Sequence, residues 1–218
     1  ETYDLGDTGR TITLGADSAQ TITGGSATDI LAVNDTTYTG KVTAAIEAVT
    51  LTAGGDITGA KGANNIVGEA LTSGGTANVT GAVLMTALQH AGFTTFTATG
   101  GSDKITLSGS GNVTAGAAIE TYDLGDTGRT ITLGADSTQT IEGGSGTDIL
   151  AVAGTTYTGT VSNINTVTIT TGGDIKGANS GAVTGATAAT ITGSVAMTAV
   201  QHNALTITAD GGSDQITL

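Results

Sequence analysis

The sequence predicts an all-β solenoid, a stack of short coils joined by tight turns, and three observations support this fold. Gly supplies 36 of the 218 residues and Thr roughly a fifth, and these residue types favour turns and strands respectively. Apolar residues alternate with Thr, as at Thr11–Thr13 and Thr206–Thr208, which is the period of a half-buried strand. The chain also repeats itself on two length scales.

The longer repeat divides the chain into two parts. Residues 1–33 return at 120–152 with three changes, from Ala19, Thr23 and Ala27 to Thr138, Glu142 and Gly146. The match continues, with small shifts, as far as GGSDKITL at Gly100 and GGSDQITL at Gly211. We therefore predict two solenoid repeat units, residues 1–119 and 120–218, of which the second is a truncated copy. The chain is expected to be a piece of a longer array.

A shorter period of nine residues lies within the long repeat. Leu5–Thr13, Gly15–Thr23 and Gly24–Ala32 each form a polar turn followed by a strand with an apolar eighth residue. Such a unit cannot bury its own apolar side chains, whereas stacked coils cover one another. Because turns alternate between two sides, a turn should stack on the one about 18 residues away, or one residue more where Leu14 is inserted. Tandem β-sandwich modules are the alternative fold, but the nine-residue period and the lack of Trp do not favour them.

The composition excludes several classes of function. The formal net charge is −13, which argues against nucleic acid and anionic membrane surfaces as partners. The chain has no Cys, so neither a disulfide scaffold nor a thiolate metal site is available. No apolar run approaches the ~18 residues of a membrane-spanning helix, and direct membrane insertion is not expected.

No pattern in the sequence predicts an enzyme. His90 and His202 occupy matching places after Gln89 and Gln201, without a partner at the spacing of a metal or catalytic site. The Gly-rich stretches lack the Lys of a phosphate-binding loop. We expect no catalytic residues and no organic cofactor, and we interpret both histidines as turn residues. The best candidate for a helix, Val83–His90, is short.

One turn carries a recognisable motif. GGSGTDILA stands at Gly143–Ala151 and GGSATDILA at Gly24–Ala32. The first of these resembles the nonapeptide G-G-x-G-x-D-x-U-x of hemolysin-type (RTX) parallel β-roll proteins at every fixed position, and the second departs from it only at Ala27. The resemblance covers roughly 18 residues. Stretches 45–51 and 163–169 are similar to strands of Thr/Gly-rich bacterial surface-layer and giant adhesin proteins.

The resemblance implies bound Ca²⁺, which is held by six to eight oxygen ligands from carboxylates, carbonyls and water. Asp29 and Asp148 are then the main candidate ligands, and Asp7 and Asp126 the second ones. The turns that carry them contribute Gly24, Gly25, Ala27, Gly143, Gly144 and Gly146. The predicted stacking also places Arg10 against Asp29 and Arg129 against Asp148, so an Arg–Asp ion pair is the alternative to a cation.

Together these features predict a non-enzymatic structural segment of an extracellular bacterial surface protein. It would belong to a surface-layer lattice or a fibrous adhesin stalk, be stabilised by calcium, and associate with identical repeats or chains. An ice-binding or ligand-binding adhesin module is the alternative, because Thr-x-Thr strands can expose an array of hydroxyl groups. The triplets TIT, TYT, TLT and TFT differ in spacing, however, and are not expected to form a regular array.

Overall fold

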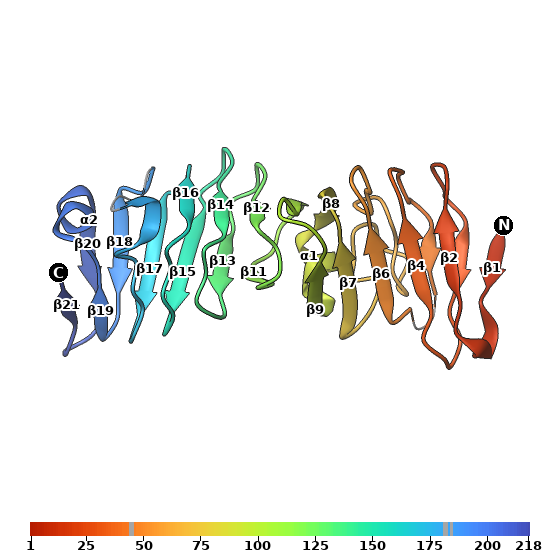
Figure 1. Cartoon of the computed structure of the whole chain (residues 1–218), viewed down its shortest axis with the longest axis horizontal. Coiled ribbons are helices and arrows are strands. Elements are labelled where there is room, and N and C mark those ends of the chain that lie inside the picture. Colours follow the sequence, from red (N-terminus) through yellow and green to blue (C-terminus); the bar gives the residue numbers. More distant parts are fainter. Residues whose placement is uncertain (44–45, 181–182, 184) are drawn as a thin grey trace. The chain divides into compact units, whose positions relative to one another are not determined.

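The chain folds as an all-β solenoid of parallel strands in the computed structural model, which describes residues 1–43, 46–180, 183 and 185–218 (Figure 1). It forms two compact units, Glu1–Ser110 and Gly111–Leu218. The strand pairings within each unit are parallel, so the alternative of β-sandwich modules, which are antiparallel, is wrong. The sequence repeat restarts at Glu120, yet the second compact unit begins at Gly111. Residues 111–119 therefore fold with unit 2.

Unit 1 contains two sheets and one further strand pair. One sheet has the order β2-β4-β6-β7-β9, the other β1-β3-β5, and β8 pairs with β10. The strands are β1 (Thr2–Asp4), β2 (Thr11–Leu14), β3 (Thr21–Thr23), β4 (Ile30–Val33), β5 (Lys41–Val42), β6 (Ala48–Leu51), β7 (Gly75–Val79), β8 (Ala82–Thr86), β9 (Phe93–Ala98) and β10 (Lys104–Ser108), with a 3₁₀ turn η1 (Gly6–Thr8) and helix α1 (Ala87–Ala91).

Unit 2 repeats this plan. One sheet has the order β11-β13-β15-β17-β18-β20, strands β12, β14 and β16 pair in sequence, and β19 pairs with β21. The strands are β11 (Val113–Ala115), β12 (Thr121–Asp123), β13 (Thr130–Leu133), β14 (Thr140–Glu142), β15 (Ile149–Ala153), β16 (Thr160–Ser162), β17 (Thr166–Thr170), β18 (Ala188–Ile191), β19 (Ser194–Ala196), β20 (Thr206–Ala209) and β21 (Gln215–Thr217), with η2 (Ala178–Ser180) and α2 (Ala199–Ala204).

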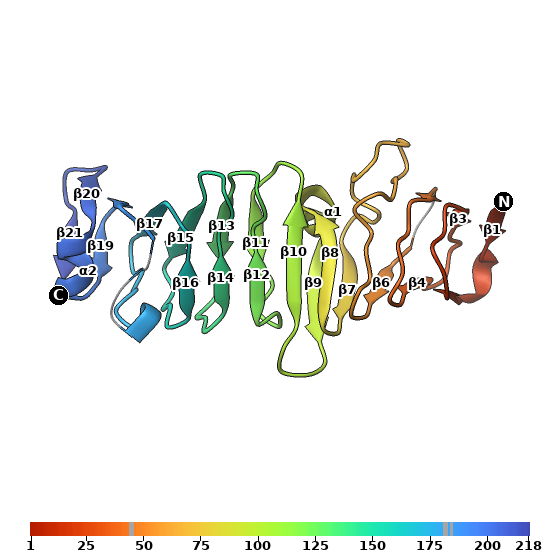
Figure 2. The same ribbon diagram turned by 90° about the horizontal axis from the view of Figure 1, so that it is seen from above.

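The register confirms the predicted stacking distance. Thr11 pairs with Ile30 in unit 1, and Thr130 pairs with Ile149 in unit 2, the nineteen-residue step that an inserted Leu produces. Viewed from above, strands of successive coils lie side by side within each unit (Figure 2). Turns therefore stack on turns, and strands on strands.

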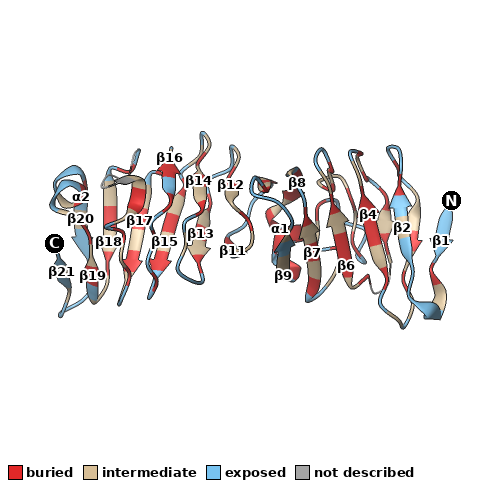
Figure 3. Ribbon diagram, viewed as in Figure 1, coloured by how far each residue is buried: buried red, intermediate tan, exposed pale blue. Residues whose placement is uncertain are grey.

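In many strands, alternate residues point into the coil and form the core. Ile131, Leu150 and Val167 are paired in register along one sheet of unit 2, and each is fully buried. Buried and partly exposed residues alternate along these strands (Figure 3). Complete burial of one such side chain contributes about 1.5–3 kcal/mol, so the stacked aliphatic columns supply the main favourable term of the fold.

The helix predicted over Val83–His90 is wrong in its first half. Residues 82–86 form β8, with Val83 and Met85 facing inward, because alternation of buried and exposed residues suits a strand. Helix α1 begins only at Ala87, where Thr86 and Gln89 form a capping box. The second copy has the same box, with Thr198 and Gln201.

Candidate functional site

The two motif aspartates lie inside the protein at the ends of their turns. Asp29 directly precedes β4 and Asp148 directly precedes β15, and both side chains have no exposed surface. Leu31 and Leu150, two residues after the respective aspartates, are fully buried in the core. The apolar eighth position of the motif therefore holds the sixth-position carboxylate in place.

Both carboxylates accept hydrogen bonds from backbone N–H groups. In unit 1, Asp29 Oδ1 accepts from the Arg10 amide at 2.8 Å, and its Oδ2 accepts from the Gly25 amide at 2.6 Å. In unit 2, Asp148 Oδ1 accepts from the Arg129 amide at 3.1 Å, and its Oδ2 accepts from the Gly144 amide at 2.9 Å. Each carboxylate thus closes its own turn and ties it to the preceding coil.

The stacked arginines meet these aspartates through their main chain. The Nε atoms of the two side chains donate elsewhere, from Arg10 to Thr8 Oγ1 and from Arg129 to the Thr127 carbonyl, each at 3.2 Å. Burial lowers the pKa of Arg129, while the negative charges of Asp148 and Asp123 act in the opposite direction. The sequence therefore placed the right residues together, and the peptide N–H groups of Arg10 and Arg129 donate the hydrogen bonds to Asp29 and Asp148.

The glycines of the motif permit the close approach of adjacent coils. A Cβ atom at Gly25 would overlap the carbonyl oxygen of Gly6, and one at Gly144 would overlap that of Gly125. Gly146 is equally crowded by the backbone of the preceding coil. In the first copy Ala27 replaces this Gly. Its Cβ would lie 3.4 Å from a Cβ atom added at Gly9. The motif glycines thus serve coil stacking.

The second pair of candidate ligands, Asp7 and Asp126, is exposed. Asp7 Oδ1 accepts a hydrogen bond from the Ser26 amide at 3.2 Å, and Asp126 Oδ1 accepts one from Ser145 Oγ at 3.1 Å. Ser26 and Ser145 belong to the motif turns, so the structure does bring each aspartate to the turn that stacks on it. Both of these contacts are again donor-to-carboxylate bonds.

Each motif turn is also tied to the following coil, by a residue that sequence reasoning missed. The Asp29 amide donates to Glu47 Oε2 at 2.7 Å, and the Asp148 amide donates to Asn165 Oδ1 at 2.7 Å. Glu47 and Asn165 lie one coil further along, so a search for acceptor side chains at the coil spacing could have found them.

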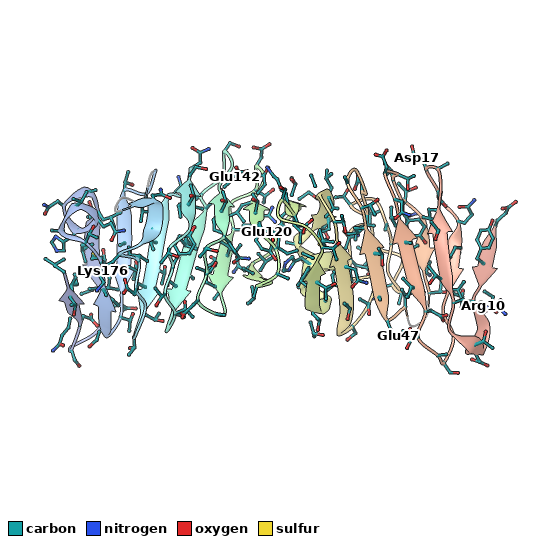
Figure 4. The ribbon with its side chains drawn as sticks, viewed as in Figure 1. Arg10, Asp17, Glu47, Glu120, Glu142 and Lys176 are labelled. Atoms are coloured by element: carbon teal, nitrogen blue, oxygen red, sulfur yellow. The ribbon has the colours of Figure 1, made fainter. Side chains whose placement is uncertain are left out.

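The same arrangement recurs on other turns of the solenoid. Asp17 Oδ1 accepts from the Thr37 amide at 2.8 Å, Asp136 Oδ1 from the Thr156 amide at 2.7 Å, and Asp214 Oδ1 from the Gly193 amide at 2.6 Å. Figure 4 shows Asp17 on the edge of unit 1 opposite to Arg10 and Glu47. Acidic side chains therefore act as acceptors between coils on both edges of unit 1.

Each carboxylate oxygen of Asp29 and Asp148 has two lone pairs, and a backbone N–H group occupies one of them. Calcium binding, which uses oxygen ligands, stays a prediction at these two residues. Within the part of the chain that the structure describes, no group of three or more Asp, Glu or His side chains is arranged to hold a metal ion. The turn carboxylates accept hydrogen bonds from buried N–H groups. A buried N–H group without an acceptor would destabilise the fold.

The matching histidines have different surroundings. His90 is buried and stacks on Phe96 with ring centroids 4.3 Å apart, and desolvation lowers its pKa to about 4. Its counterpart His202 is half-buried. Both lie in the short helices α1 and α2, rather than in turns as the sequence suggested.

No family model, curated protein or solved structure matches the chain. Among the described residues, none of the helices has the length and apolar character needed to cross a membrane.

Proposed function

We propose that the chain is a non-enzymatic structural segment of an extracellular bacterial surface protein, part of a surface-layer lattice or of a fibrous adhesin stalk. The observation that carries this proposal is the use of the acidic turn residues. Asp29 and Asp148 are buried acceptors that join successive coils, and Asp17 and Asp136 join coils from exposed turns. Side chains that could carry chemistry are thus committed to holding a repeated scaffold together.

The composition and the sequence resemblance support the location. A net charge of −13 keeps repeats soluble through mutual repulsion, and the Thr/Gly-rich strands resemble those of surface-layer proteins and giant adhesins. The β-roll resemblance also predicts stabilisation by calcium. The N–H donors at Asp29 and Asp148 instead favour turns that are stable without the ion, and a melt with chelator distinguishes these two expectations.

Antibodies test the location directly. A serum raised against the purified chain should label intact cells of the source organism, and brief treatment of those cells with protease should remove the label. Labelling that appears only after the cells are permeabilised would contradict a surface location.

Ice binding is a second candidate, and the register of unit 2 favours it. Outward residues of successive strands form one rank: Thr114, Thr132, Ala151, Thr168, Thr190 and Thr208. The irregular spacing of the Thr triplets in the sequence is therefore absorbed by loops, and five of the six strands present a Thr at the same height. Neighbouring strands lie about 4.8 Å apart, which gives a regular row of hydroxyl and methyl groups.

The freezing behaviour of a solution of the protein tests this second candidate. An ice-binding chain should separate the melting and freezing points of ice, and Thr168→Tyr should abolish the effect because a large ring interrupts the rank. Thr138→Tyr, at an exposed position outside the rank, is the matched control. A wild-type chain without any separation of the two temperatures would exclude ice binding.

A further inference from the structure

Two lysines of unit 1 lie side by side in successive coils. Lys41 begins β5 and pairs in parallel register with Lys61. The Lys61 amide donates to the Gly40 carbonyl at 2.8 Å, and the Val42 amide donates to the Lys61 carbonyl at 2.8 Å. Neighbouring strands lie about 4.8 Å apart, so the coil stacking itself brings two positive charges together, and like charges repel each other.

Neither lysine is neutralised by an acidic side chain, although the chain is rich in them. The sequence has nineteen Asp and Glu residues and six Lys and Arg residues. Among the residues that the structure describes, none forms an ion pair or a hydrogen bond with the ammonium group of Lys41 or Lys61. The loop after Lys61 carries one carboxylate, Glu69, whose Oε1 accepts from the Asn64 amide at 2.6 Å. Both lysines are half-buried, so salt screens their repulsion less than it screens fully exposed charges.

The second copy of the repeat carries no charge at these two positions. The counterparts of Lys41 and Lys61 are Thr160 and Asn179. The side chain of Asn179 pairs with the backbone of Val161, since its Oδ1 accepts from the Val161 amide and its Nδ2 donates to the Val161 carbonyl. Neutral side chains therefore suffice for the stacking of these coils, and the lysine pair is a property of unit 1 that the fold does not require.

Both lysines line a hollow on the surface of unit 1. The hollow has a volume of about 450 Å³, and Thr21, Asn65 and Val67 also line it. The Thr hydroxyl and the Asn amide are neutral hydrogen-bond donors. Val67 is 60% exposed, and it belongs to the segment between β6 and β7, which extends outward as a loop (Figure 2). The hollow thus combines two positive charges, two neutral donors and an exposed apolar side chain.

We propose that this hollow binds a phosphate or sulfate group, held by the ammonium groups of Lys41 and Lys61 and by hydrogen bonds from Thr21 and Asn65. Lys binds such oxyanions as a point charge with three donors, and two lysines neutralise the two negative charges of the group. The anion removes the repulsion between the lysines. Val67 offers an apolar surface to the organic part of a monoester, so the ligand is the free ion or its monoester. The proposal goes beyond the scaffold role and does not rest on it.

The experiment titrates the full chain with sodium phosphate and, separately, with sodium sulfate, at an ionic strength held constant with sodium chloride. Amide NMR shifts report the dissociation constant and the location of binding. The test variant is Lys41→Thr with Lys61→Asn, which introduces the residues of the second copy. The matched control is Lys104→Gln with Lys176→Thr, which also introduces the residues of the other copy and removes the same two charges outside the hollow.

We expect saturable shifts at Lys41 and Lys61, and binding at least about tenfold weaker in the test variant than in the wild type or the control. A wild-type chain that binds neither anion, or a control that loses as much affinity as the test variant, would overturn the proposal. If the test variant does not fold, Lys41→Gln alone should show the loss, and unchanged binding would then overturn it. Phenyl phosphate distinguishes the two sources of the ligand, because tighter binding than inorganic phosphate supports a monoester and equal or weaker binding supports the free ion.

Discussion

Replacing Asp148 by Asn tests the role of the buried carboxylate with the smallest change in shape. Asp148 accepts one hydrogen bond from Arg129 and one from Gly144, and its side chain has no exposed surface. Asn keeps one oxygen, but the other becomes an NH₂ group that faces an N–H donor. One bond to a charged acceptor becomes neutral, and one buried amide loses its acceptor.

The expected cost follows from these two changes. A hydrogen bond to a charged group contributes about 1.5–3 kcal/mol, and a buried unsatisfied donor costs about 1–3 kcal/mol. We expect the free energy of unfolding to fall by about 3 kcal/mol. In a cooperative unit of roughly 100 residues this lowers the melting midpoint by about 12–24 °C.

Denaturant unfolding monitored by circular dichroism measures the loss, and hydrogen exchange locates it at the amides of Arg129 and Gly144. Asp126→Asn is the matched control. Asp126 is exposed, and it accepts a hydrogen bond from Ser145 Oγ, which lies in the same turn as Asp148. That variant should change stability by less than about 0.5 kcal/mol. A loss below about 1 kcal/mol in Asp148→Asn, with both amides still protected, would refute the reasoning.

Three further predictions concern other contacts between and within coils. Gly144→Ala should prevent folding of unit 2 or destabilise it by several kcal/mol, because the added Cβ would overlap the Gly125 carbonyl oxygen. Gly15→Ala should be tolerated, because there is open space around Gly15. Thermal melts compare the two variants. Lowering the pH from about 6.5 to about 4 should reduce the free energy of unfolding by up to about 1.4 kcal/mol per pH unit. The reason is that the folded state holds the pKa of His90 at about 4, so the unfolded chain takes up the proton first. A His90→Leu variant that shows the same pH dependence in urea titrations would contradict this. Gln89→Ala should cost about 2 kcal/mol, because Gln89 caps α1 and donates to the Ile57 carbonyl; the urea midpoint measures it, and an unchanged midpoint would count against it.

Much of the fold follows from periodicity. The nine-residue units and the inserted Leu14 predicted the pairing of Thr11 with Ile30, since turn and strand lengths alone fix which residues stack. The helix at α1 was placed too early, because Val83 and Met85 are equally suited to a strand face and to a short helix. Only the capping box of Thr86 and Gln89 marks the true start.

The sequence indicated which residues of the turns stack on one another. The motif placed Asp29 beside Arg10 and Asp148 beside Arg129, as found. The sequence could not show that peptide N–H groups donate to the carboxylates, since that depends on the path of the turn backbone. The partners Glu47 and Asn165 were missed because they belong to coils outside the recognisable motif.

We expect the buried turn carboxylates to be held by backbone N–H groups without a bound cation. The melting midpoint of the unmodified chain in ~10 mM calcium and in excess chelator, at equal ionic strength, tests this most directly. A calcium site with a Kd of ~10⁻⁴ M would add about 2.7 kcal/mol of stability under the first condition. If the N–H groups hold the carboxylates without calcium, the two midpoints should be equal. A midpoint lowered by several degrees in chelator, with the difference lost in the Asp29→Asn and Asp148→Asn double variant, would contradict it.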